Sequence, residues 1–199
     1  MENLIGTNFD DKLAGNGAAN ILTGLGGNDI IAGAAGNDQL SGGDGNDLLN
    51  GGTGNDLLNG GAGIDTASYA NAAAAVSVEL GLQGLAQNTG AAGTDTLVNI
   101  EHLIGSNFKD RLHFDYSRGF TMNGGAGNDT LGIDYGDGTL NGDTGDDTMY
   151  LAEANGTLNG GDGNDTLSPG GVVGNLNGGN GNDKISVLYT MVSSVALSP

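Results

Sequence analysis

Aspartates recur at one position of a nine-residue repeat in this sequence, and their type and spacing could support metal chemistry. The repeat is clearest in residues 42–59, which read GGDGNDLLN GGTGNDLLN. Glycine stands at positions 1, 2 and 4, aspartate at position 6 and an aliphatic residue at position 8. Carboxylates at a fixed interval suit a hard cation such as calcium, which takes about six to eight oxygen ligands in a tolerant geometry.

The glycines and the residues after them predict the elements that hold these carboxylates. Glycine takes left-handed backbone angles without a Cβ clash, so positions 1–4 can turn tightly. Positions 6–9 then form a short strand whose side chains alternate, so that position 8 points inward and builds a core. Nine residues make half a coil, and residues 18 apart stack at the strand spacing of about 4.8 Å. The pattern predicts an all-β parallel solenoid.

Stacking brings the position-6 carboxylates of successive coils close together. Two like charges about 5 Å apart repel by about 3 kcal/mol at an effective dielectric constant near 20. A bound cation removes this repulsion, and the glycine-rich turns offer backbone carbonyls as further ligands. One aspartate in such a loop is explained equally well as a solvated turn former. A column of them in fixed register favours calcium.

The nonapeptide frame runs unbroken from residue 6 to residue 68, and alternate units fall on opposite edges of the coil. Column A carries Asp11, Asp29, Asp47 and Asp65, and column B carries Asn20, Asp38 and Asp56. The units starting at residues 6 and 15 lack several glycines, so we expect weak or empty sites there. The predicted core residues at position 8 are Leu13, Leu22, Ile31, Leu40, Leu49, Leu58 and Ala67.

Residues 69–104 interrupt the motif. Alternation predicts a strand at residues 76–80 and another at 95–100, while the alanines at 72–75 are expected to form a loop. We expect this segment to be a widened part of the same solenoid. Residues 2–13 match residues 101–112 at an offset of 99, which places Asp110 where Asp11 stands. Met1 then falls where Ile100 stands, so we expect the chain to begin in mid-motif, as part of a longer protein.

The frame resumes at residue 115, but only every second unit carries the full loop. This edge, column C, carries Asp110, Asp129, Asp147, Asp165 and Asp183. The opposite edge has Gly138, Gly156 and Gly174 in place of aspartate, which predicts metal-free glycine turns. The core continues through Met122, Leu131, Leu140, Met149, Leu158, Leu167, Leu176 and Ile185. We therefore expect a first block at 1–68, a widened segment at 69–104, a second block at 105–186 and a capping tail at 187–199.

Composition excludes several classes of function. The chain of 199 residues has 24 acidic and 5 basic residues and a net charge of −19, which argues against nucleic acid or an anionic membrane surface as partner. It has no cysteine and no apolar stretch long enough for a membrane span. His102 and His113 are its only histidines, and HExxH, GxSxG and Walker motifs are absent. We therefore expect no enzyme activity.

The repeats resemble those of the RTX (repeats-in-toxin) family of secreted proteins from Gram-negative bacteria, over nearly the whole chain. The resemblance implies a right-handed parallel β-roll, folding driven by calcium and export through type I secretion machinery. It also implies that position-6 aspartates and loop carbonyls at positions 1 and 3 bind each ion. The implied aspartates are Asp29, Asp38, Asp47, Asp56, Asp65, Asp129, Asp147, Asp165 and Asp183, with Asp110 as a further candidate. The loop positions are Gly24, Gly26, Gly33, Ala35, Gly42, Asp44, Gly51, Thr53, Gly60, Ala62, Gly124, Ala126, Gly142, Thr144, Gly160, Asp162, Gly178 and Asn180.

These observations predict a non-catalytic, calcium-dependent folding module of a secreted, extracellular bacterial protein. Counting stacked pairs gives roughly seven to nine calcium ions. The alternative is a module that binds polysaccharide or a cell surface, attached to an extracellular enzyme such as an alginate-modifying enzyme, a lipase or a protease. Its candidate surface is the rows of threonine and asparagine at positions 7 and 9 of the second block. Threonine also suits strands and asparagine suits turn entry, which explains these rows without a ligand.

Overall fold

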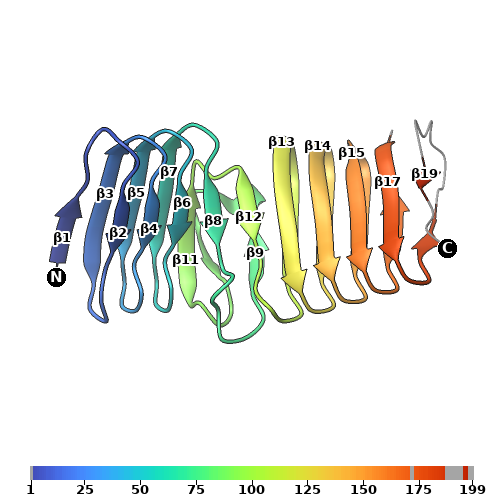
Figure 1. Ribbon diagram of the computed structural model, residues 1–199, viewed down its shortest axis with the longest axis horizontal. Helices are drawn as coiled ribbons and strands as arrows, with labels where there is room; N and C mark the ends of the chain where they lie inside the picture. The colour runs from blue at the N-terminus through green and yellow to red at the C-terminus, as the bar shows by residue number, and fades with distance from the viewer. Residues whose placement is uncertain (1, 171–172, 187–194, 197–199) are drawn as a thin grey trace. The chain divides into compact units, whose positions relative to one another are not determined.

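Parallel β-strands provide almost all of the regular structure of this protein (Figure 1). The computed structural model describes residues 2–170, 173–186 and 195–196. It comprises a first unit, residues 1–104, and a second unit, residues 105–199. Within the described residues the only helical turn is the 3-10 turn η1 (Leu80–Leu82). The predicted all-β parallel β-roll is confirmed.

The first unit contains two stacks of parallel strands. One stack has the order β1 (Glu2–Ile5), β3 (Asn20–Gly26), β5 (Gln39–Asp44), β7 (Leu57–Ala62) and β11 (Thr94–Val98), with antiparallel β10 (Ala86–Asn88) beside β11. The other has the order β2 (Lys12–Ala14), β4 (Ile30–Ala32), β6 (Leu48–Asn50), β8 (Thr66–Ser68) and β12 (His102–Ile104). Leu22 pairs with Leu40 and Leu40 with Leu58, which confirms the 18-residue coil.

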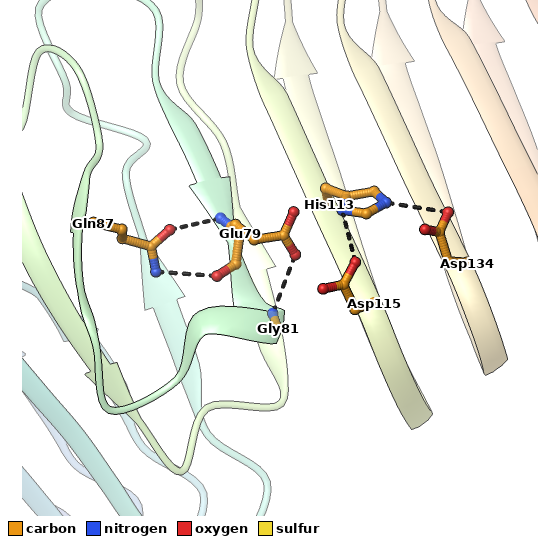
Figure 2. Close-up of polar contacts among 6 residues, drawn as sticks. All are labelled: Glu79, Gly81, Gln87, His113, Asp115 and Asp134. Atoms are coloured by element: carbon orange, nitrogen blue, oxygen red, sulfur yellow. Dashed lines mark hydrogen bonds and ion pairs between the residues drawn. The ribbon is translucent and has the colours of Figure 1, made fainter.

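The interruption of the motif folds as short strands and loops. Residues 72–75 form no helix, as predicted, and the expected strands appear as β9 (Ser77–Glu79) and β11. The Gln87 side chain binds the backbone of Glu79, with Glu79 N donating to Gln87 Oε1 at 2.7 Å and Gln87 Nε2 donating to Glu79 O at 3.1 Å (Figure 2). Glu79 Oε1 in turn accepts a hydrogen bond from Gly81 N and caps η1. The Gln87 side-chain amide thus joins β10 (Ala86–Asn88) to β9.

The second unit is built from longer parallel strands: β13 (Arg111–Ala126), β14 (Thr130–Thr144), β15 (Thr148–Asp162), β16 (Thr166–Pro169), β17 (Val173–Asn180), β18 (Lys184–Ile185) and β19 (Val195–Ala196). The predicted glycine turns opposite column C are not separate turns, because the ladder continues through that edge and pairs Gly138 with Gly156. A Cβ on Gly138 would lie 2.9 Å from Phe120 O, so glycine allows the coils to approach here. The predicted capping tail, residues 187–199, lies outside the described residues except for β19, which pairs with β17.

The core follows the predicted position-8 column. These side chains are 0–1% exposed in both units: Leu22, Ile31, Leu40, Leu49, Leu58, Ala67, Met122, Leu131, Leu140, Met149, Leu158, Leu167 and Leu176. Leu13 and Ile185, near the two ends of the column, are only half-buried. The second unit adds a further buried row that the repeat pattern does not predict, namely Phe114, Ile133 and Leu151. Each fully buried leucine contributes about 1.5–3 kcal/mol to stability.

Candidate metal centre

One oxygen of each position-6 carboxylate forms a hydrogen-bonded ladder along its column. The backbone N–H of a position-6 residue donates to Oδ1 of the aspartate one coil later. This contact repeats along columns A, B and C with donor–acceptor distances of 2.7–3.0 Å. The ladder fixes each carboxylate against the backbone of the preceding coil, and it leaves the second oxygen, Oδ2, for another partner.

Eight of these second oxygens are buried and have no hydrogen-bond partner within the described structure. They are the Oδ2 atoms of Asp29, Asp38, Asp47, Asp56, Asp65, Asp129, Asp147 and Asp165. Their side chains are 0–2% exposed. Leaving a buried charged group without a partner is costly, and a regular row of such groups is not expected without a ligand. The row therefore fits a bound cation.

Backbone carbonyls lie beside the orphaned oxygens. A Cβ built on Gly42 would overlap Asp47 Oδ2 and would lie 2.5 Å from Gly60 O, in the next coil. A Cβ on Gly33 would meet Asp38 Oδ2 and Gly51 O in the same way. Position 1 must be glycine because the carboxylate and the carbonyl of the next coil occupy that space. These oxygens are the type of donor set that calcium prefers.

Positive backbone angles shape the rest of each loop. At positions 2 and 4, Gly43 has φ +124° and Gly45 has φ +135°, a conformation that favours glycine. The position-3 carbonyls accept hydrogen bonds from the preceding coil, as in Gly27 N to Asp44 O at 2.9 Å. Position-1 residues thus lie beside the orphaned oxygens, and the position-3 residues Asp44, Thr53, Ala62, Thr144, Asp162 and Asn180 link successive loops.

Burial changes the acidity of the columns. It raises the pKa of Asp56, Asp65 and Asp129 to about 6 and that of Asp147 to about 7, with neighbouring carboxylates adding to the rise. The ladder hydrogen bond opposes this effect because it stabilises the charged form. Without metal, these carboxyl groups are therefore harder to ionise near neutral pH. A bound divalent cation would stabilise their charged form.

The first loop of each column differs from the others. Asp11 Oδ2 accepts hydrogen bonds from Thr7 N at 2.5 Å and from Thr7 Oγ1 at 2.9 Å. Ser106 donates to both carboxylate oxygens of Asp110, through its N–H and its hydroxyl. In column B, Asn16 N donates to Asn20 Oδ1 at 2.7 Å. Asp110, a predicted ligand, is therefore supplied with protein donors that the eight orphaned oxygens lack.

Two further carboxylates extend columns A and B, and the nonapeptide frame did not predict them. Asp65 N donates to Glu101 Oε2 at 2.8 Å, and Asp56 N donates to Asp95 Oδ1 at 3.0 Å. Their separations along the chain are 36 and 39 residues instead of 18, so neither residue belongs to the next unit of the frame. A signal exists for Asp95, because residues 90–98 read GAAGTDTLV and resemble GAAGNDQLS at residues 33–41. Asp183, in turn, receives the last ladder bond of column C.

The asparagine row of the second unit forms side-chain hydrogen bonds along the strands, and the threonine row follows the strand register. Asn141 Nδ2 donates to Asn123 Oδ1 at 2.6 Å, and Asn159 Nδ2 donates to Asn141 Oδ1 at 2.7 Å. The position-7 threonines pair in register along the strands, and the described rows contain Thr121, Thr130, Thr139, Thr148, Thr157, Thr166, Asn123, Asn141, Asn159 and Asn177. Amides that bind one another along a ladder stabilise the stacking of the coils.

Replacing Asp147 with alanine is expected to damage two adjacent sites. Asp147 Oδ1 accepts a bond from Asp129 N, its N–H binds Asp165 Oδ1 and its Oδ2 is orphaned, so it faces both neighbouring coils. Calorimetry should count about two fewer calcium ions. The matched control is Glu153→Ala, an exposed carboxylate on the opposite edge, which should change little. Equal losses in both variants would contradict the assignment of column C.

Sequence comparison identifies the repeat. The family described as RTX calcium-binding nonapeptide repeat, in four copies, matches residues 5–40, 33–67, 121–131 and 134–167, which together exceed half of the chain. All eight aspartates with an orphaned oxygen lie within these ranges. No curated protein sequence matches the chain. In the described residues, no helix combines the length and apolar character needed to cross a membrane. The chain therefore belongs to the family of RTX calcium-binding nonapeptide repeats.

Proposed function

We propose that this chain is the non-catalytic, calcium-dependent folding module of a secreted bacterial protein, with one calcium ion beside each orphaned carboxylate oxygen. The observation that carries the proposal is the set of eight buried, unpartnered Oδ2 atoms in regular columns. A cation there satisfies the second oxygen of each aspartate, while the first oxygen keeps its ladder bond. Because the columns form only when the coils stack, calcium binding and folding share the same free energy.

Calcium suits these columns better than magnesium. The donors around each orphaned oxygen are carboxylates and backbone carbonyls spread over two coils. Calcium accepts six to eight such oxygens at about 2.3–2.6 Å, whereas magnesium needs a near-octahedral shell at about 2.0–2.1 Å and retains its water. The ligand geometry of stacked loops is set by the strand spacing, which favours the larger and more tolerant ion.

The link between calcium and folding fits a secreted protein. Without calcium, the net charge of −19 and 41 glycines favour an extended chain. Such a chain could pass a narrow type I secretion channel from a low-calcium cytosol and then fold outside the cell. We accordingly assign the module an extracellular location and the type I secretion machinery as its partner during export.

The contacts of His113 support a non-catalytic role. His113 lies between two carboxylates, with Nδ1 3.6 Å from Asp115 Oδ1 and Nε2 3.3 Å from Asp134 Oδ1 (Figure 2). Its ring also lies 5.9 Å from that of Tyr150, centroid to centroid. These contacts join neighbouring strands β13, β14 and β15, and they engage both ring nitrogens. The mutual amide bonds of the asparagine ladder likewise favour a structural role over glycan recognition.

Calcium stoichiometry tests the proposal. Calorimetric titration of the calcium-free chain is expected to give roughly seven to nine ions, in line with one ion for each of the eight orphaned oxygens. Magnesium at the same concentration serves as the control and should produce little heat and little ordering. A count below four would contradict the assignment of one ion to each stacked carboxylate.

A further inference from the structure

Asparagine stands directly before glycine nine times in this chain. The asparagines of these pairs are Asn16, Asn50, Asn59, Asn123, Asn141, Asn155, Asn159, Asn177 and Asn180. Glycine has no Cβ, so its backbone nitrogen can closely approach the side-chain carbonyl carbon of the preceding asparagine. Attack at that carbon removes the amide nitrogen as ammonia, a reaction called deamidation. The sequence allows this reaction at every pair, and the fold decides where it occurs.

Eight of the nine asparagines lie within β-strands, which oppose the reaction. Attack requires the backbone to turn the nitrogen of the glycine toward the asparagine side chain, whereas a strand keeps the backbone extended. Some of the amides are also held by hydrogen bonds. Asn141 Nδ2 donates to Asn123 Oδ1 at 2.6 Å, and Asn180 Nδ2 donates to Asp162 Oδ1 at 2.7 Å. The folded chain therefore protects these eight pairs.

The pair Asn16–Gly17 is the exception. Both residues are exposed and lie outside the strands, between β2 and β3. A Cβ built on Gly17 would meet nothing within 4 Å, so this side of the residue is open to solvent. By contrast, a Cβ on Gly51, which follows Asn50, would overlap the side chain of Asp56. Among the nine pairs, only Asn16–Gly17 thus combines exposure of both residues with a backbone outside the strands.

Protein donors face the amide carbonyl of Asn16. Ala18 N donates to Asn16 Oδ1 at 2.9 Å, and Asn20 Nδ2 donates to the same oxygen at 3.4 Å. Negative charge develops on this oxygen when a nucleophile attacks Asn16 Cγ, and donors placed at such an oxygen stabilise the transition state. Asn16 N in turn donates to Asn20 Oδ1 at 2.7 Å, which fixes the loop. These contacts favour attack at the amide carbon.

We propose that Asn16 is a site of spontaneous deamidation in the folded chain. Gly17 N attacks Asn16 Cγ and forms a new C–N bond. The C–N bond of the side-chain amide then breaks, and ammonia leaves with the proton that Gly17 N carried. The product is a five-membered succinimide ring. Solvent water opens this ring at either carbonyl group, which leaves aspartate or isoaspartate at residue 16.

Both products change the first loop of column B. Aspartate adds one negative charge to the loop that contains Asn20. Isoaspartate adds the same charge and also routes the backbone through the former side chain. The former backbone carbonyl of Asn16 accepts a hydrogen bond from Ala35 N at 3.3 Å, and in isoaspartate it becomes the free carboxylate. Deamidation therefore alters a contact between two successive coils.

Peptide mapping by mass spectrometry tests the site in the full chain. One sample is incubated folded, in calcium at mildly alkaline pH, and the matched sample is incubated in urea at the same pH. In the folded sample, deamidation should be fastest at Asn16 and slow at Asn50 and Asn141. In urea, the three asparagines should react at similar rates. Equal rates at Asn16 and Asn141 in the folded sample, or no reaction at Asn16, would overturn the inference.

Two variants identify the attacking nitrogen. Gly17→Ala should slow the reaction at Asn16 by about tenfold, because the added Cβ crowds the nitrogen. The fold should tolerate this change, since the Cβ meets no atom within 4 Å and Gly17 lies outside the left-handed region. Asn16→Gln should remove the signal at residue 16, because a longer side chain closes the ring more slowly. Circular dichroism of both variants should match that of the wild type. An unchanged rate at Asn16 in Gly17→Ala would contradict attack by Gly17 N.

Discussion

Removal of calcium is expected to abolish the β-sheet circular dichroism of this chain. Ordering the backbone costs about 1–2 kcal/mol per residue, and each nine-residue unit buries one main aliphatic side chain worth about 1.5–3 kcal/mol. The stacked carboxylates add repulsion between coils, because eight of their oxygens are buried without a partner. Strand hydrogen bonds alone do not compensate for both terms, so the metal-free chain should unfold at neutral pH.

Calcium should restore the β signal cooperatively, since each coil provides the template for the next. Circular dichroism in chelator, in millimolar calcium and in millimolar magnesium measures this effect, with magnesium as the control that restores little. A full β spectrum in chelator at neutral pH would mean that the fold forms without calcium, which would contradict calcium-dependent folding.

Acidification of the calcium-free chain is expected to recover part of the β structure. In the folded chain the pKa is raised from 3.8 to about 6 for Asp56, Asp65 and Asp129 and to about 7 for Asp147. A raised folded-state pKa means that protonation favours folding. This stabilisation is fully present below the unfolded value of 3.8 and is lost as the pH rises through 6 to 7.

The pH dependence of calcium binding should have the opposite direction. Protons compete for the same carboxylates, so calcium affinity should fall as the pH decreases through 7 to 6. Circular dichroism of the calcium-free chain between pH 4 and pH 8 measures the first effect, and calorimetry at pH 5.5 and 7.5 measures the second. The Asp147→Asn variant lacks the carboxyl group with the highest pKa among these, so its profile should be flatter. A calcium-free chain with the same β content at every pH would contradict the burial of these groups.

The core and the stacking could be predicted because they follow one repeating rule. A single aliphatic residue in nine must face inward on a strand, so Leu22, Leu40 and Leu58 were placed correctly in one buried row. Register follows directly, because a shift of one residue would turn the whole row outward. The orientation of column A and column B on opposite edges follows from the same alternation of units.

The ends of the columns could not be predicted from that rule. Asp95 and Glu101 follow Asp56 and Asp65 after 39 and 36 residues instead of 18, and only the folded chain brings them beside these aspartates. The difference between Asp110 and the orphaned aspartates depends on Ser106, whose N–H turns toward the carboxylate. Position 2 of the full loops instead takes a positive φ, at glycine as in Gly43 and also at Leu25, Ala34 and Asp143. The row formed by Phe114, Ile133 and Leu151 lies at positions outside the repeat rule, so it too was missed.

A crystal structure of the calcium-loaded chain, with anomalous scattering from the bound ions, tests the carboxylate columns most directly. We expect anomalous peaks beside the Oδ2 atoms of the eight orphaned aspartates, and no strong peak at the first loops, where Thr7 and Ser106 already bind Asp11 and Asp110. Columns without peaks, in a crystal that contains calcium, would contradict the binding of calcium by stacked aspartates.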